Sequence, residues 1–190
     1  MNRHKNSFGM IAVSLLFAAV CSLPCGAQEN TLTSSKAIDA IEGVYKHAFS
    51  NGSVSGERYR SEDVIEIMKY SPDAIYFRIA LQFFNGHSCG IYGIAKFHEG
   101  AFVYQNSDDT STDLACTLRI QRDSKWLKIT DAVDAESASS CRSYCGMRGS
   151  LRNYEISMAK KRQIKYVPLI QNSRQYLEAV GEFKKQSDRQ

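Results

Sequence analysis

The middle of the chain alternates between apolar and other side chains with a period of two. Between residues 74 and 83 the alternating apolar side chains are Ile75, Phe77, Ile79, Leu81 and Phe83, with smaller or polar neighbours between them. Successive side chains of a β-strand point to opposite faces, so this period indicates a strand with a buried face. Similar short segments follow at roughly ten-residue spacing, with turn residues between them and no helical crossover. The pattern predicts a mainly β domain, a small antiparallel β-barrel or sandwich with meander order.

A short helix is expected before the strands. Ser35 can cap a helix that runs to Ile41, and Gly43 then interrupts it. The polar stretch 28–35 has no periodicity and is expected to be an irregular lead-in. A first strand is expected from Gly43 to Phe49, ended by a turn at Asn51-Gly52.

A second helix is expected near the C-terminus, where Ser173 can cap it. Its apolar residues form a single stripe, made of Tyr176, Leu177, Val180 and Phe183. Such a stripe is stable only when it is covered, so we expect this helix to pack on the barrel or across its mouth.

The N-terminus has the three parts of a secretory signal. Arg3 and Lys5 precede an uncharged stretch at residues 8–23, and small residues end at Ala27. The stretch is shorter than the ~20 residues needed to span a bilayer. We therefore expect a signal peptide at residues 1–27 and a single domain at 28–190, in the periplasm or secreted.

Charge argues against nucleic-acid binding. Without residues 1–27 the chain has 22 basic and 20 acidic side chains, so it is close to neutral. Its one basic run is Lys160-Lys161-Arg162 with Lys165, a pattern typical of a solvated face, whereas phosphate recognition needs a longer basic stripe. We expect no nucleic-acid partner, and no membrane span after signal cleavage.

Four cysteines remain after the expected cleavage: Cys89, Cys116, Cys141 and Cys145. An even number in an exported chain predicts two disulfides, with three possible pairings. The pairing we favour joins Cys89 to Cys116, because it closes a long loop. Cys141 would then pair with Cys145 and stiffen its own segment.

Catalytic constellations are not evident. Nucleophilic hydrolysis needs a serine or cysteine beside a base, and a zinc site needs paired ligands at known spacings. The candidate residues are the histidines His47, His87 and His98 and the loop carboxylates Asp108, Asp109, Asp131 and Asp134. We expect no enzyme activity, no metal and no cofactor.

Two segments are candidates for binding a protein. The first is Cys141–Ser150, where Arg142, Tyr144, Met147 and Arg148 belong to residue types enriched at interfaces. A disulfide-pinned loop of this composition would be preorganised for recognition. A plain stapled connection that closes the fold explains the segment equally well.

The second is Ser55-Gly-Glu-Arg-Tyr59, which resembles the Ser-Gly-to-Tyr loop of periplasmic lysozyme inhibitors of Gram-negative bacteria. The resemblance implies that Ser55 and Tyr59 enter the cleft of the target and hydrogen-bond its catalytic carboxylates. A polar hairpin loop without such a role is the alternative. More broadly, Asn85-Gly-His-Ser-Cys89, the segment 141–150 and Ser173-x-x-Tyr-x-x-Ala179 look like an uncharacterised family of exported Gram-negative proteins.

The resulting prediction is an inhibitor of, or immunity protein against, a cell-wall hydrolase such as lysozyme. An alternative is a lipocalin-like carrier of a small apolar ligand. Aromatic residues that would line its cavity are Tyr76, Phe77, Phe83, Phe84, Tyr92, Phe102 and Tyr104. A structural envelope protein is a third possibility.

Overall fold

The computed structural model describes residues 26–106, 115–132 and 139–189, with side chains from residue 33 onward. The elements are α1 (Gly26–Ile41), β1 (Gly43–Gly52), β2 (Arg58–Ser71), β3 (Ala74–Gln82), η1 (Phe84–Gly86), β4 (Ser88–His98), β5 (Ala101–Gln105), β6 (Thr117–Asp123), β7 (Trp126–Thr130), η2 (Arg142–Tyr144), β8 (Tyr154–Ser157), η3 (Met158–Lys160), β9 (Lys161–Arg162), α2 (Val167–Gln171) and α3 (Arg174–Ser187).

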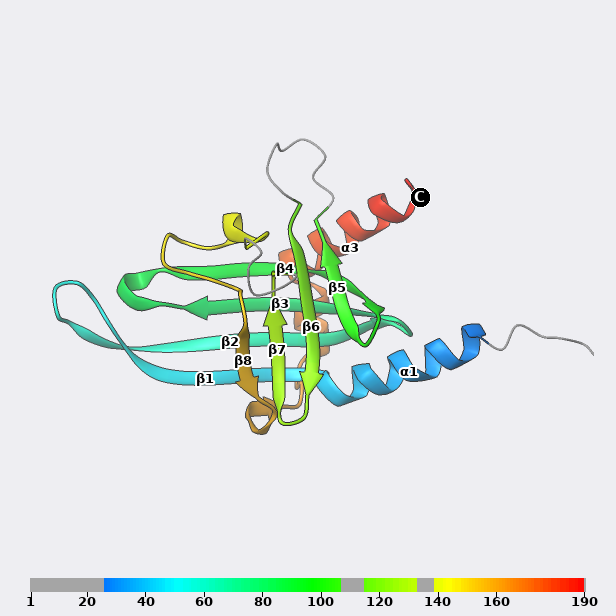
Figure 1. The fold of residues 1–190 in the computed structure, drawn as a ribbon, viewed down its shortest axis with the longest axis horizontal. Coiled ribbons are helices and arrows are strands. Elements are labelled where there is room, and N and C mark those ends of the chain that lie inside the picture. Colours follow the sequence, from blue (N-terminus) through cyan, green and yellow to red (C-terminus); the bar gives the residue numbers. More distant parts are fainter. Residues whose placement is uncertain (1–25, 107–114, 133–138, 190) are drawn as a thin grey trace, which may run out of the picture.

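The strands form one antiparallel sheet with the order β8-β7-β6-β5-β4-β3-β2-β1-β9. Figure 1 shows strands β1 to β4 in one layer and strands β5 to β8 crossing in front of them. The sheet therefore curls into a nearly closed barrel, and the predicted mainly β meander is confirmed.

The two edges of the sheet meet because the chain itself joins them. β8 and β9 lie at opposite edges, yet only η3 separates them in the sequence. A side-chain bond crosses the same gap, since the Tyr154 hydroxyl on β8 donates to Asp63 Oδ2 on β2 at 2.8 Å. Closure reduces the free edge that would otherwise be open to aggregation.

The core lies between the two layers, where the inward faces of strands β1 to β8 meet. The period of two predicted for β3 is confirmed, because Ile75, Phe77, Ile79 and Leu81 are all buried in one cluster. The opposite face of β3 is covered as well, so Tyr76 is also fully buried. Beyond Phe77 this outer face is only partly covered, because Arg78, Ala80 and Gln82 are half-buried, so burial alternates along the rest of β3.

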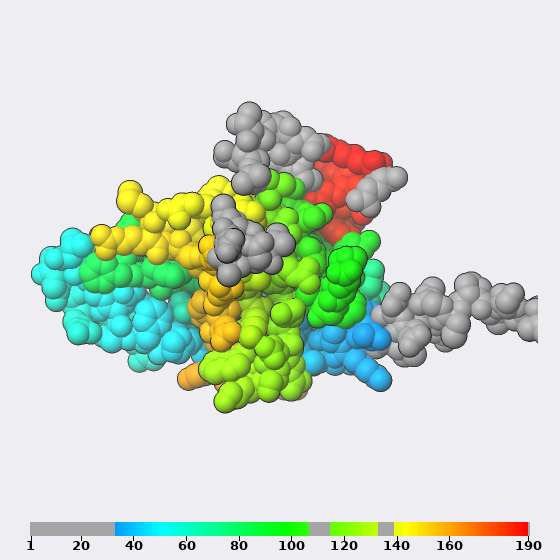
Figure 2. All heavy atoms as spheres, viewed as in Figure 1, coloured from blue at the N-terminus to red at the C-terminus, as the bar shows by residue number. Residues whose placement is uncertain are grey.

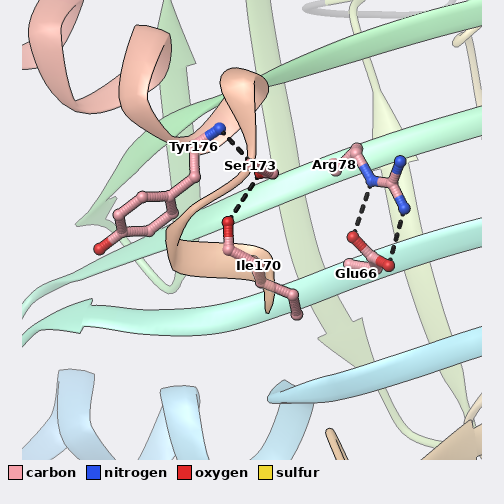
Figure 3. A network of polar contacts seen from close by, with 5 residues as sticks. All are labelled: Glu66, Arg78, Ile170, Ser173 and Tyr176. Carbon is pink, nitrogen blue, oxygen red and sulfur yellow. Dashed lines mark hydrogen bonds and ion pairs between the residues drawn. The ribbon is translucent and has the colours of Figure 1, made fainter. Parts of the chain in front are cut away.

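The outer face of β3 and β4 is covered by helix α3, which packs against both strands. Ser173 caps it as predicted, with its Oγ accepting from Tyr176 N at 3.2 Å and donating to Ile170 O at 2.7 Å (Figure 3). Beneath α3 lies a second apolar cluster, the outer core cluster, which is made of Met68, Ala74, Tyr76, Ile94 and Ala179. Tyr176 packs on this cluster, as do Val180 and Phe183. Leu177, however, is 60% exposed. Its assignment to the docked stripe was wrong, because it points away from the sheet.

The N-terminal helix is longer than predicted. Residues 28–35 are not an irregular lead-in, since α1 begins at Gly26 and ends at Ile41, just before Gly43. Extending a helix adds a hydrogen bond per residue without a new nucleation step, and Ala, Gln, Glu and Leu favour it. Ile38 and Ile41 enter the core between the layers. None of the described helices has the length and apolar character needed to cross a bilayer.

The β1–β2 hairpin extends beyond the strands that cross it, at the left of Figure 1. Asn51-Gly52 is not its turn, because β1 continues to Gly52 and β2 already begins at Arg58. This part of the hairpin lies outside the apolar core, so apolar alternation does not reveal it. It is held instead by polar groups such as Asn51 Nδ2, which donates to Ser61 Oγ at 3.1 Å.

The favoured disulfide pairing was wrong. Cys89 bonds to Cys145, and Cys116 bonds to Cys141. Cys89 lies on β4 and Cys116 precedes β6, while β5 lies between these strands in the sheet. Strands two places apart are separated by roughly 10 Å, which exceeds the reach of a disulfide.

Candidate functional site

Three segments that are distant in the sequence converge at one end of the barrel. They are the β1–β2 turn and its flank (53–60), the β3–β4 turn (84–87) and the loop 141–150, and together we call them the loop end. Figure 2 shows loop 141–150 in yellow beside the cyan β1–β2 hairpin and the green β3–β4 hairpin. The two segments predicted to bind a protein are thus parts of one surface.

The two hairpin turns are bound to each other by hydrogen bonds. Val54 N donates to Asn85 Oδ1 at 3.2 Å, and Gly86 N donates to the Tyr59 hydroxyl at 2.8 Å. Asn85 and Gly86 have φ values of 60° and 72°. An Asn-Gly pair tolerates this left-handed backbone, which explains why the chain turns here.

Loop 141–150 is fixed at two points by different strands. The Cys116 disulfide holds Cys141 beside β6, and the Cys89 disulfide holds Cys145 beside β4. Gly146 N also donates to Ser88 O at 2.8 Å. Gly149 packs so closely that an added Cβ would lie 2.7 Å from Cys89 Sγ. The loop is therefore a stapled connection whose outer side chains are presented on a rigid backbone.

The structure divides the six predicted contact residues into two groups. Ser55, Arg142, Met147 and Arg148 are exposed on the loop end. Tyr59 and Tyr144 are half-buried and already hydrogen-bonded. The Tyr144 hydroxyl accepts from Asn106 Nδ2 at 3.0 Å, and its ring packs against the core. Tyr144 thus supports the loop from beneath, whereas the exposed four are placed for contact.

Met147 was among the predicted contact residues, but two further exposed apolar side chains at the loop end, Val54 and Phe84, were not predicted to contact a partner. Val54 is 71% exposed, Phe84 43% and Met147 79%. The Arg148 guanidinium carbon lies 5.6 Å from the centre of the Phe84 ring, a cation–π distance that joins loop 141–150 to the β3–β4 turn. The signal available in the sequence was the presence of Val54 and Phe84 in otherwise polar turns.

A groove of about 550 Å³ continues from the loop end along the edge of the β1–β2 hairpin. Its lining is partly aromatic and partly basic: Ala48, Phe49, Ser50, Arg58, Tyr59 and Arg60. Arg58 and Arg60 are exposed, so the residues that line the groove combine positive charge with aromatic character. This combination suits an acidic partner surface.

A buried carboxylate behind the groove ties three strands together. Asp63 is 5% exposed and accepts from Gln82 N and from the Tyr154 hydroxyl, both at 2.8 Å. His47 Nδ1 lies 3.9 Å from the same carboxylate. Ser61, two residues before Asp63 on β2, accepts instead from Asn51 Nδ2. The cluster joins β2, β3 and β8 and has a structural role.

Changing Tyr154 to Phe is expected to lower the free energy of unfolding by about 2 kcal/mol at neutral pH. The reason is that the buried Asp63 carboxylate loses the hydrogen bond that the Tyr154 hydroxyl donates to it. Burial, together with the bond to Asp63, raises the pKa of Tyr154 above its ordinary value of about 10. Because the folded state favours the neutral hydroxyl, the contribution of Tyr154 to stability is fully present below pH ~10. It is lost as the pH rises further, where the tyrosine of the unfolded chain ionises. The difference in unfolding free energy between the wild type and Tyr154→Phe, measured by urea titration, should therefore become smaller above pH ~10.

Other residue types suited to chemistry do not gather into a site in the described part of the chain. No group of three potential metal ligands occurs there. The sulfur of Cys89 is in a disulfide, so it cannot act as a thiolate beside His87. Among the loop carboxylates, Asp131 is buried and accepts from Cys141 N at 3.2 Å, while Asp108, Asp109 and Asp134 lie outside the described residues.

The seven aromatic residues proposed to line a carrier cavity lie on different surfaces. Phe77, Phe102 and Tyr104 are packed in the core, with Phe83 against its border. Tyr76 and Tyr92 belong to the outer face beneath α3, and Phe84 is exposed in η1. A common ligand cavity would need these rings on one face, so their placement gives no support to the carrier alternative, which stays a prediction.

Comparisons with protein-family models, with curated proteins and with solved structures gave no significant match.

Proposed function

We propose that the protein is an extracytoplasmic binding domain that inhibits, or gives immunity to, a cell-wall hydrolase. The observation that carries the proposal is the convergence of both candidate segments, 55–59 and 141–150, on the loop end. Two disulfides hold this end, and disulfides of this kind form in oxidising compartments outside the cytoplasm.

Rigidity favours binding by such a surface. The turn at 53–57 is bound to η1, and loop 141–150 is bound to β4 and β6, so little conformational entropy remains to be lost on association. Val54, Phe84 and Met147 supply exposed apolar area, and the exposed polar residues Ser55, Arg142 and Arg148 lie in the same segments. An apolar centre with a polar rim is the usual anatomy of a protein interface.

The polar groups of the loop end match the cleft of a glycoside hydrolase. Such enzymes use a pair of carboxylic side chains flanking the scissile bond. Arg58, Arg60 and Arg148 offer cationic donors, and Ser55 offers a hydroxyl at the tip. The Tyr59 hydroxyl accepts its bond from Gly86 N, so that bond does not consume the hydroxyl proton. These groups complement a carboxylate-lined cleft in charge and in hydrogen bonding.

The test is the inhibition of lysozymes of several classes and of peptidoglycan amidases by the purified protein. Val54→Asp is expected to weaken inhibition about thirtyfold, because it places a carboxylate in the centre of the interface beside the target's own carboxylates. Leu169→Asp is the matched control, since Val54 and Leu169 are both 71% exposed. Leu169 lies outside the loop end, and its variant should inhibit like the wild type.

The outcomes separate the activity from the surface that carries it. If a stoichiometric excess of the protein slows none of these enzymes, the hydrolase partner is wrong. If the wild type inhibits and Val54→Asp inhibits equally well, the loop end is not the contact surface. Ser55→Ala then tests the hairpin resemblance separately, because the tip hydroxyl is lost without added charge.

A further inference from the structure

The segment that follows β8 has an unusual charge distribution. From Ile156 to Leu177 the chain has five basic residues and no acidic one, although 20 acidic residues occur elsewhere. Lys160, Arg162 and Lys165 are exposed. None of these three forms an ion pair with any residue that the structure describes. Their charge is therefore presented to the surroundings.

Exposed apolar side chains follow directly after these cations. Tyr166 is 67% exposed, Val167 38% and Leu169 71%. They form one run with Lys165, which precedes them, and Leu177 at the beginning of α3 adds a further residue at 60% exposure. Exposed apolar residues are unremarkable singly, but a contiguous group marks an interaction surface.

The fold determines which side chains of this segment face outward. Ile164 and Ile170 pack against the outer core cluster, so their neighbours Tyr166, Val167 and Leu169 remain outside. The beginning of the segment is anchored, since β9 pairs with β1 and Lys161 Nζ donates to Ala40 O at 2.9 Å. The exposed group cannot fold inward without displacing the two isoleucines.

We infer that residues 160–169 form a docking surface for an anionic phospholipid bilayer. Exposed cations meet the phosphate headgroups, while Tyr166 and Leu169 enter the boundary with the acyl chains. Lysine is depleted at protein interfaces, whereas lysine with tyrosine and leucine is typical of peripheral membrane contacts. Two of the three exposed cations are lysines. This composition favours a lipid surface over an acidic protein.

The test is cosedimentation with vesicles of phosphatidylcholine alone and of two parts phosphatidylcholine to one part phosphatidylglycerol. The full chain is expressed and the protein is purified from the envelope fraction. Mass spectrometry of its N-terminus then checks that residues 8–23 have been removed, because this apolar stretch would itself bind lipid. Wild type is expected to bind only the anionic vesicles. The variant K160Q/R162Q/K165Q should bind about a hundredfold more weakly, since each cation contributes about fivefold.

Leu169→Ser tests the apolar half of the surface and should weaken binding about tenfold. The matched control is R58Q/R60Q/R148Q, which removes three cations at the loop end and should bind vesicles like the wild type. All the altered side chains are exposed, so melting temperatures should agree.

Three results would overturn the inference. The first is equal binding to both kinds of vesicle, and the second is equal vesicle binding by wild type and K160Q/R162Q/K165Q. The third is binding to soluble polyglutamate that K160Q/R162Q/K165Q loses and Leu169→Ser retains, combined with no binding to vesicles. That third result would assign the segment to an acidic protein partner.

Discussion

Replacing Cys89 and Cys145 together by alanine is expected to lower the free energy of unfolding by about 4 kcal/mol. The disulfide joins residues 56 positions apart. A cross-link over a long stretch excludes many conformations of the unfolded chain, so its removal favours unfolding. Domains are stable by about 5–15 kcal/mol, and this variant should lose a large share of that. Urea unfolding followed by the fluorescence of Trp126, the single tryptophan, measures the change.

The second disulfide provides the comparison. Cys116 and Cys141 are 25 positions apart, so their replacement by alanine should cost about 3.5 kcal/mol, slightly less than the first. Peptide mapping without reduction should recover Cys89 with Cys145 and Cys116 with Cys141. A peptide pair joining Cys141 to Cys145, or an unfolding free energy unchanged by either variant, would contradict this account.

The strands were predictable where one face of the sheet is buried. The alternation from Ile75 to Phe83 reflects burial of one face, so the period of two marks β3 directly. The same rule fails for β1–β2 beyond the core, where Asn51 and Ser61 bond to each other in place of apolar contacts. Strand pairing there depends on backbone bonds that leave little trace in the sequence.

The disulfide pairing could not be derived from sequence spacing. It depends on which strands are neighbours, and the insertion of β5 between β4 and β6 separates Cys89 from Cys116. The assembly of the loop end could not be predicted from the sequence either, because it too depends on which segments are neighbours in space. Residues 55–59 and 141–150 were each singled out by composition, but their proximity follows from the Cys89–Cys145 bond and from the η1 turn. Only three-dimensional contacts bring the two candidates together.

Replacing Gly93 by alanine is expected to lower the free energy of unfolding by about 3 kcal/mol, at the upper end of the cost of overpacking a core. Gly93 lies on β4 opposite Phe77, and the ring of Tyr104 covers it. An added Cβ would lie 2.4 Å from Tyr104 Cε2 and 2.6 Å from Cδ2. The ring is only 4% exposed and packs edge-on against Phe77, so it cannot swing away without opening the core.

Gly90 on the same strand gives the matched control, because nothing lies within 4 Å of a Cβ built there. Gly90→Ala should therefore leave the unfolding free energy nearly unchanged, which separates a clash from a general effect of alanine on β4. In a Tyr104→Leu background the added methyl meets a smaller side chain, so Gly93→Ala should cost at least about 1 kcal/mol less than in the wild type. An equal cost in both backgrounds would mean that the backbone conformation at position 93 requires glycine, and that a clash with the Tyr104 ring does not cause the loss of stability.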